Sequence, residues 1–294
     1  VNLFFIISGF VIFMTLERTQ VASDFVISRF SRLFPMYWAA VALTFVVTHW
    51  LGLPGKLVSL GAAAANVLMF HNLLGVPHVD GVYWTLEVEL YFYCGMLLLF
   101  LRGGMHRVFE ATAALLLVRW AYFIAHAGWG IDLSFTVGRL LILKQLPWFV
   151  LGIAIYVLTQ TQASRLEHGR ALVAGVFAVV TLAVTDSLML GALAAVLAAL
   201  VWLAASGRLP LPGGPLLPWL GSISYPLYLL HENVGWSLMR KALLHGWSAD
   251  MAAAAVLLAM LGLAHLASRG IEQPAMRWVR QRWHARKQGG HGTA

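Results

Sequence analysis

The chain has 294 residues, of which 60% are hydrophobic and only 11% charged, whereas about a quarter of an ordinary soluble domain is charged. This composition excludes a typical water-soluble fold and indicates a protein that crosses a membrane several times. The formal net charge of +8 does not indicate nucleic-acid binding, because the basic residues lie in short connections and at the end of the chain. A single cysteine, Cys94, excludes an internal disulfide and a cysteine-rich zinc site, and no metal-ligand spacing stands out.

Apolar runs of about 15 to 25 residues recur along nearly the whole chain, which is the length that a helix needs to cross a bilayer. We therefore expect an all-α, polytopic transmembrane helical bundle with about nine spans plus one re-entrant or short segment. The membrane domain is expected at 1–276, followed by a basic cytoplasmic tail at 277–294. The predicted spans are 2–16, 34–52, 82–101, 108–126, 137–158, 170–185, 188–205, 217–239 and 250–270.

The apolar stretch at 60–76 is shorter than these spans, and Asn66 and His71 interrupt it. Arg29 and Arg32 mark the first connection as cytoplasmic under the positive-inside rule, and the basic tail is cytoplasmic for the same reason. The number of crossings between them must then be even, which requires that this stretch does not cross. We interpret it as re-entrant or as lying against the bundle, because irregular backbone is tolerated at membrane depth where protein or a cavity surrounds it.

Arg29 and Arg32 are three residues apart and precede Pro35. If this stretch is helical, the spacing places both guanidiniums on one face. Two adjacent guanidiniums are suited to bidentate binding of phosphate. Simple anchoring at the inner membrane surface is the alternative.

The predicted span 82–101 carries Glu87 and Glu89, although a carboxylate in hydrocarbon costs about 3 kcal/mol on insertion scales. Two residues on a helix are separated by about 200°, so the two carboxylates need separate partners. Each has a tyrosine four residues later, Tyr91 and Tyr93, and can meet it on its own face. The alternative is an ion pair with a basic residue of another span, for which the candidates are Arg139 and Lys144.

Near the end of the chain, the predicted span 217–239 contains His231 and Glu232. Tyr228 precedes His231 by three residues and shares its face, and a histidine exchanges protons near neutral pH. A hydrogen-bonded packing residue is the alternative. Glu272 lies where the last span reaches the cytoplasm, and its expected partner is Arg269 or the arginines of the first connection.

Five stretches together are more specific than any one of them, and in the same order they resemble the membrane acyltransferase-3 family. The resemblance covers nearly the whole chain. That family acylates sugars of bacterial surface polysaccharides, some antibiotics and other small molecules. The stretches are NLFFIISGFVI at 2–12, RxxRLxPxYW at 29–38, WTLxVE at 84–89, ISYPLYLLH at 223–231 and IEQP at 271–274.

The resemblance implies a multi-pass protein of the bacterial inner membrane with no permanently bound cofactor. The donor would be an acyl-CoA, usually acetyl-CoA, and the acceptor a hydroxyl of a carbohydrate or another molecule. Arg29 and Arg32 match the arginine pair of the family, for which binding of the CoA phosphates is a sensible role, and Glu89 matches its glutamate. His231 and Glu272 match recurring motif positions.

One departure concerns the base. The family's catalytic histidine lies on a helix that precedes the stretch at 2–12, and this chain starts at Val1 without an initiator methionine. We therefore expect an N-terminally truncated sequence, and we do not give the role of the base to His231. Glu89 and His231 remain the catalytic candidates here, Glu89 for orienting the base or binding the acceptor. The candidates for lining the cavity or binding the acceptor are Tyr37, Trp38, Trp84, Tyr228, Glu232 and Glu272.

Two alternatives stay open at this point. A transporter of a sugar or lipid-linked precursor would also use buried carboxylates and a histidine, in a proton relay. A truncated pseudo-enzyme would carry the same motifs without activity. The arginine pair separates the first alternative from the enzyme, because only the enzyme needs to bind CoA.

Overall fold

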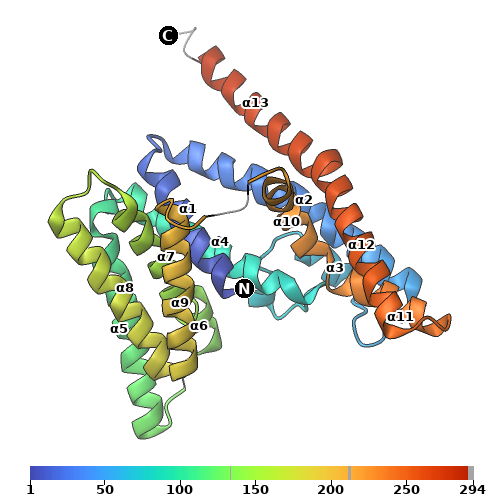
Figure 1. Cartoon of the computed structure of the whole chain (residues 1–294), viewed down its shortest axis with the longest axis horizontal. Coiled ribbons are helices and arrows are strands. Elements are labelled where there is room, and N and C mark those ends of the chain that lie inside the picture. The colour runs from blue at the N-terminus through green and yellow to red at the C-terminus, as the bar shows by residue number, and fades with distance from the viewer. Residues whose placement is uncertain (133, 211–212, 291–294) are drawn as a thin grey trace. The chain divides into compact units, whose positions relative to one another are not determined.

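The computed structural model describes residues 1–132, 134–210 and 213–290, and these residues form helices and connections without a strand (Figure 1). The chain divides into two compact units, each built from two separate stretches. The first unit comprises Val1–Phe25 and Val88–Leu211, and the second comprises Val26–Glu87 and Pro212–Ala294. The all-α prediction is confirmed.

In the first unit, α7 (Leu146–Thr159) is the central helix, and α1, α8 and α9 pack against it. Every residue of α7 from Leu146 to Val157 is buried, as expected of a helix that is apolar on all sides. The unit also contains most of α4. Its other helices are α1 (Asn2–Glu17), α4 (Trp84–Leu101), α5 (Val108–Trp129), α6 (Phe135–Leu140), α8 (Arg165–Thr185) and α9 (Leu188–Ala205), with a 3-10 turn at Met105–Arg107.

Two glycines bring α1 and α7 into close contact. A Cβ atom on Gly9 would lie 2.2 Å from the Phe149 carbonyl oxygen, and one on Gly152 would lie 2.0 Å from the Ile6 carbonyl oxygen. Real Cβ atoms do not approach so closely, so the two backbones require glycine at both positions. Small residues at helix interfaces are the usual means of close helix packing in membranes.

The prediction of one helix at 137–158 is wrong. The structure has two helices there, because α6 ends at Leu140 and α7 starts at Leu146. Ile142 in the intervening turn has φ of 47°, a backbone conformation that no helix contains and that is rare for a β-branched residue. Lys144 and Gln145 lie in the break and Pro147 follows it, but the long apolar runs on either side led to the prediction of a single span.

In the second unit, a hydrogen bond from Tyr225 to the Leu33 carbonyl oxygen joins α10 to α2 (Ala22–Leu51), and α12 contacts both α10 and α11. Figure 1 shows α13 continuing from α12, and the two join through a π-helical turn at Ser268–Glu272. The remaining helices are α3 (Leu60–Asn66), α10 (Leu216–Leu230), α11 (Asn233–Leu244), α12 (Ala249–Ala267) and α13 (Gln273–Gly290), with 3-10 turns at His71–Leu74 and Gly81–Tyr83.

Two further boundaries differ from the prediction. The span expected at 34–52 belongs to a helix that starts at Ala22 and continues through Pro35, so the arginine pair lies on a helix instead of in a loop. The span expected at 217–239 is broken at His231 and Glu232, where α10 ends and α11 begins. His231 caps the end of α10 with an exposed side chain and does not lie deep in a helix.

The stretch at 60–76 does not cross a membrane as a helix. Its only α-helix, α3, has seven residues, and at 1.5 Å per residue it covers about a third of a 30 Å hydrocarbon core. The chain then turns back, because the Asn66 side chain donates to the Pro77 carbonyl oxygen at 2.9 Å and accepts from the Val79 amide at 2.9 Å. This geometry supports the re-entrant interpretation.

Six helical stretches in the described ranges are long and apolar enough to cross a membrane, and three shorter apolar helices accompany them. The predicted number of about nine spans remains a prediction. The long stretches are Ala22–Leu51, Gly81–Leu101, Met105–Trp129, Arg165–Thr185, Leu188–Ala205 and Ala249–Lys287, and the shorter ones are Asn2–Glu17, Leu146–Thr159 and Leu216–Leu230.

Candidate functional site

The arginine pair lies near the start of α2 in the second unit. Arg29 is half-buried and donates from Nη2 to the Ser28 hydroxyl at 3.2 Å, whereas Arg32 is exposed. Ser31 is buried between them and donates to the Ser28 carbonyl oxygen at 3.0 Å. Because the helix continues through this stretch, the i, i+3 spacing places both guanidiniums on one face, as predicted from the sequence.

Glu272 reaches the same end of α2 from the π-helical turn. Its Oε2 atom accepts a hydrogen bond from the Ser268 hydroxyl at 3.0 Å, and the carboxylate is close enough to Arg32 for the two charges to interact. Of the two partners expected for Glu272, the structure therefore places an arginine of α2 beside it. The Gln273 side chain also donates to Ser268, at 3.3 Å.

Two more residues join this site that the sequence did not single out. Tyr225 of α10 donates to the Leu33 carbonyl oxygen at 2.8 Å and thus fixes α10 to α2. Arg280 of α13 donates from Nε to the Ser31 hydroxyl at 3.3 Å. The aromatic SYP motif gave a signal for Tyr225, but Arg280 is one of several similar arginines in the tail, and nothing in the pattern distinguishes it.

Tyr37 and Trp38 hold the re-entrant segment against α2. The Tyr37 hydroxyl donates to the Asn66 carbonyl oxygen at 2.7 Å, and the Trp38 indole donates to the Val67 carbonyl oxygen at 3.0 Å. Tyr37 is fully buried and forms an edge-to-face contact with Tyr83, with ring centroids 5.1 Å apart. Both residues predicted to line a cavity therefore hold backbone of the re-entrant segment in place.

The start of α4 supplies two further candidates to the second unit. Trp84 is half-buried as the first residue of α4, next to the 3-10 turn that precedes it. Glu87 is fully buried, and its charge acts on Tyr37. A buried carboxylate and a buried phenol thus lie near each other between α2 and α4.

The other end of the second unit contains Tyr228, His231 and Glu232. The hydroxyls of Tyr228 and Thr85 are 2.7 Å apart, and the Tyr228 and His231 rings have centroids 5.8 Å apart, so the predicted shared face exists. The His231 Nδ1 atom lies 2.8 Å from the Tyr228 carbonyl oxygen. Glu232 forms an exposed ion pair with Lys56 at 3.5 Å, which indicates a structural role.

Asp80 at this end was not predicted from the sequence. It is fully buried, and its two carboxylate oxygens accept from the Val82 amide at 3.3 Å and the Asn233 amide at 3.1 Å. The pKa of Asp80 is raised to about 6, chiefly by burial and to a smaller extent by the charge of Glu232, against the lowering effect of the two backbone amides and of His231. Its position directly before a helical turn was the available signal, since aspartate is a preferred N-cap residue.

Glu89 belongs to the first unit, where two hydroxyls bind the same carboxylate oxygen. Tyr93 donates to Oε1 at 2.5 Å, which confirms the expected contact four residues along the helix. Ser8 of α1, inside the FFIISGF stretch, donates to the same atom at 2.8 Å. The final glutamate of the WTLxVE motif is therefore hydrogen-bonded to the motif at 2–12.

A family model described as an acyltransferase domain matches residues 1–268. The chain belongs to the membrane acyltransferase-3 family. It is thus a multi-pass membrane acyltransferase that transfers groups other than aminoacyl groups, and this decides against the transporter alternative. No curated protein and no solved structure matches the chain.

A buried arginine in the first unit of this acyltransferase was also not predicted from the sequence. Arg119 of α5 donates to the Thr185 hydroxyl, to the Asp186 carboxylate and to the carbonyl oxygens of Leu143 and Lys144, both at 2.9 Å. It therefore ties α5 to the end of α8 and to the turn between α6 and α7. Its hydrogen-bond partners are all structural, so we give it a role in stability.

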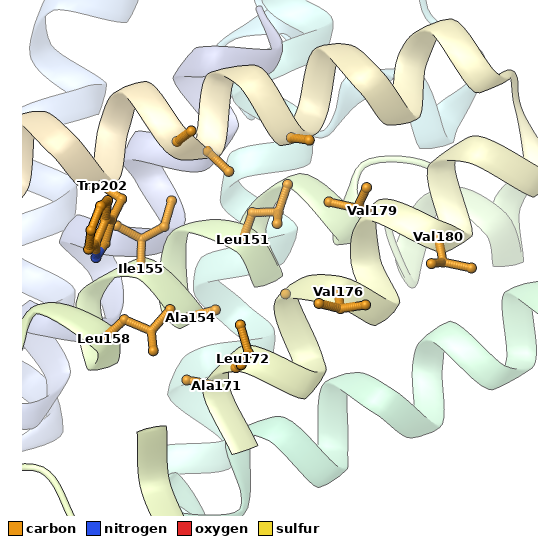
Figure 2. A pocket seen from close by; sticks show the side chains of 14 residues that line it. Leu151, Ala154, Ile155, Leu158, Ala171, Leu172, Val176, Val179, Val180 and Trp202 are labelled. Atoms are coloured by element: carbon orange, nitrogen blue, oxygen red, sulfur yellow. The ribbon is translucent and has the colours of Figure 1, made fainter. Parts of the chain in front are cut away.

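The pocket drawn in Figure 2 lies between α7, α8 and α9 of the acyltransferase and has a volume of about 350 Å³. Its walls are almost entirely apolar, so the residues that line it offer no acid, base or phosphate-binding group. Among the residues around it in the figure are Leu151, Ile155, Leu172, Val176, Val180 and Trp202.

Proposed function

We propose that this acyltransferase moves an acyl group, most simply acetyl, from acyl-CoA to a hydroxyl of a sugar or surface-polysaccharide precursor at the bacterial inner membrane. Family membership supports the reaction type. The observation that carries the choice of donor is the pair of guanidiniums at one end of α2, because a CoA thioester differs from simple thioesters by its phosphates.

In this proposal Arg29 and Arg32 hold the phosphates of the donor. Arginine suits this task, since its planar fork forms two parallel hydrogen bonds to a phosphate and keeps its charge at any physiological pH. Glu272 accepts a hydrogen bond from Ser268, and its negative charge attracts the Arg32 guanidinium. This attraction would keep the Arg32 side chain oriented. The basic end of the second unit would then face the cytoplasm, where acyl-CoA is found.

In the chemical step, the acceptor oxygen attacks the thioester carbonyl carbon, its proton passes to a base, and the CoA thiolate leaves. We assign Glu89 to positioning and not to taking this proton, because the Ser8 and Tyr93 hydroxyls already bind its Oε1 atom. A carboxylate held in this way can orient a base or an acceptor hydroxyl. His231, exposed beside Tyr228, is assigned to acceptor binding.

The donor assignment is tested by measuring the dissociation constant of acetyl-CoA for the purified protein in nanodiscs. Arg29→Ala and Arg32→Ala should each weaken binding about 10- to 100-fold, the loss expected for a hydrogen bond to a charged group. Arg165→Ala is the matched control, because it removes the same charge from the exposed start of α8 in the first unit. Unchanged affinity in both variants would contradict the proposal.

A further inference from the structure

The C-terminal helix α13 brings a third guanidinium to the arginine pair. Arg280 donates from Nε to the hydroxyl of Ser31, which lies between Arg29 and Arg32 in the sequence of α2. The three positive charges are close enough for Arg29 and Arg32 to repel Arg280. The cluster therefore combines residues from both stretches of the chain that form the second unit.

This cluster is rich in positive charge. It brings three arginines within interaction range, and the carboxylate of Glu272 interacts with one of them, Arg32. Like charges that crowd together at a partly buried place destabilise the folded protein unless an anion offsets them. A cluster of this composition is therefore suited to an anion with more than one negative charge.

Anchoring to anionic lipid explains the other arginines of α13 better than it explains Arg280. Arg282 is exposed and lies over the Trp278 ring, with its guanidinium carbon 5.6 Å from the ring centroid. Arg277 is also exposed and donates to the Gln273 carbonyl oxygen of its own helix. Arg280 is half-buried and points to α2, so its side chain is directed to the cluster instead of to the membrane surface.

The join between α12 and α13 accounts for this direction. The π-helical turn at Ser268–Glu272 changes the phase of the helix, and π-helical turns often occur at functional sites. Glu272 and Arg280 are eight residues apart, which is close to two full turns, so they lie on the same side of the helix. Both then face α2, one beside Arg32 and the other beside Ser31.

We propose that Arg280 is a further donor-binding residue, and that α13 completes a three-arginine site for a carrier with more than one phosphate group. The inference rests on the proposed function, since it assigns the same site to the CoA donor. It adds that the tail helix is part of the binding site. A thioester without phosphates should gain nothing from Arg280.

The test compares Arg280→Gln with Arg282→Gln, which removes the same charge from an exposed position on the same helix. Acetyl-CoA binding is measured in nanodiscs of phosphatidylcholine, with and without phosphatidylglycerol. Thiol release from acetyl-pantetheine, the thioester without phosphates, is measured as kcat/KM in membranes that contain the natural acceptor. Arg29→Ala is included as the reference for the proposed function.

We expect Arg280→Gln to weaken acetyl-CoA binding about tenfold or more in both kinds of nanodisc, and to leave acetyl-pantetheine turnover unchanged. Arg282→Gln should bind acetyl-CoA like the wild type. If Arg280→Gln does not fold, Arg280→Lys decides, because it keeps the charge and loses the fork. A several-fold weakening for acetyl-CoA alone supports the inference, and unchanged affinity overturns it.

Three results would overturn the inference: unchanged acetyl-CoA affinity in Arg280→Gln, an equal loss with acetyl-pantetheine, or a loss that appears only with phosphatidylglycerol. The second would show a structural role and the third a lipid headgroup as the ligand. If Arg29→Ala weakens acetyl-CoA binding while Arg280→Gln does not, only this inference fails. If neither variant changes binding, the proposed donor site fails as well.

Discussion

Ser8 and Glu89 are 81 residues apart in the sequence, yet the Ser8 hydroxyl donates to the Glu89 Oε1 atom at 2.8 Å. Tyr93 donates to the same oxygen from one turn further along α4. This arrangement fixes the carboxylate with one donor from its own helix and one from α1. It also makes the two hydroxyls interdependent, since they share a single acceptor atom.

Replacing both donors should lower the free energy of unfolding by more than the sum of the two single replacements. Ser8→Ala and Tyr93→Phe each leave one hydroxyl on Oε1 and should each lower the free energy of unfolding by about 1–3 kcal/mol. The double variant removes both donors from a buried oxygen, so we expect a coupling energy of about 0.5 kcal/mol or more. Chemical unfolding in detergent measures this. Additive losses would show that the two hydroxyls act independently.

Gly152→Ala should separate α1 from α7. The added methyl would overlap the Ile6 carbonyl oxygen, and overpacking of this kind costs about 1–3 kcal/mol. Gly262→Ala in α12 is the control, because no atom of the described residues beyond its chain neighbours and its own helix backbone lies within 4 Å of its Cβ position. That variant should be neutral or more stable by up to about 1 kcal/mol. Thermal unfolding of both variants checks the prediction, which equal shifts would refute.

Arg119→Met should destabilise the first unit without weakening donor binding. The change leaves the Asp186 carboxylate and two carbonyl oxygens without the guanidinium, and breaking a buried ion pair costs about 3–5 kcal/mol. Arg170→Met is the control, since its pair with Glu110 at 3.4 Å is exposed and contributes less than about 1 kcal/mol. Unfolding temperatures and acetyl-CoA affinity are measured together. A stable Arg119→Met protein would contradict the structural role.

Asp80 should make stability fall as the pH rises through 6. Its pKa is raised from 3.8 to about 6, so the folded protein binds the proton more tightly than the unfolded chain does. The stabilising effect of the protonated form is complete below pH 3.8 and is lost as the pH rises past about 6. Unfolding temperatures between pH 4 and 7.5 should therefore decline more steeply in the wild type than in Asp80→Asn. Parallel curves would exclude this contribution of Asp80.

Features that depend on nearby residues of the chain, such as contacts within one helix, could be predicted from the sequence. The contact of Glu89 with Tyr93 was predicted because residues four apart share a helix face. The non-crossing segment at 60–76 was predicted because its apolar run is short and interrupted, and because the basic residues require an even number of crossings. Ser8 could not be assigned to Glu89 in the same way, because the contact depends on how α1 packs against α4. Spacing along the chain carries no information about such a contact.

The misplaced boundaries have a similar cause. Hydropathy does not register the positive φ of Ile142, so 137–158 looked like one helix, and Pro35 suggested a boundary that α2 does not have. Arg280 was grouped with the rest of the basic cytoplasmic tail at 277–294, because charge alone does not tell which arginine of a helix faces inward. The π-helical turn sets that direction and leaves no sequence signal that we recognise.

The most direct test of the donor site is the release of CoA thiol from acetyl-CoA by sealed membrane vesicles. Inverted vesicles expose the cytoplasmic face and should release thiol, and right-side-out vesicles should not. The double variant Arg29→Ala/Arg32→Ala should lose this release while its unfolding temperature stays close to that of the wild type. Undiminished release by the double variant in inverted vesicles would contradict the assignment of the arginine pair to the acyl-CoA donor.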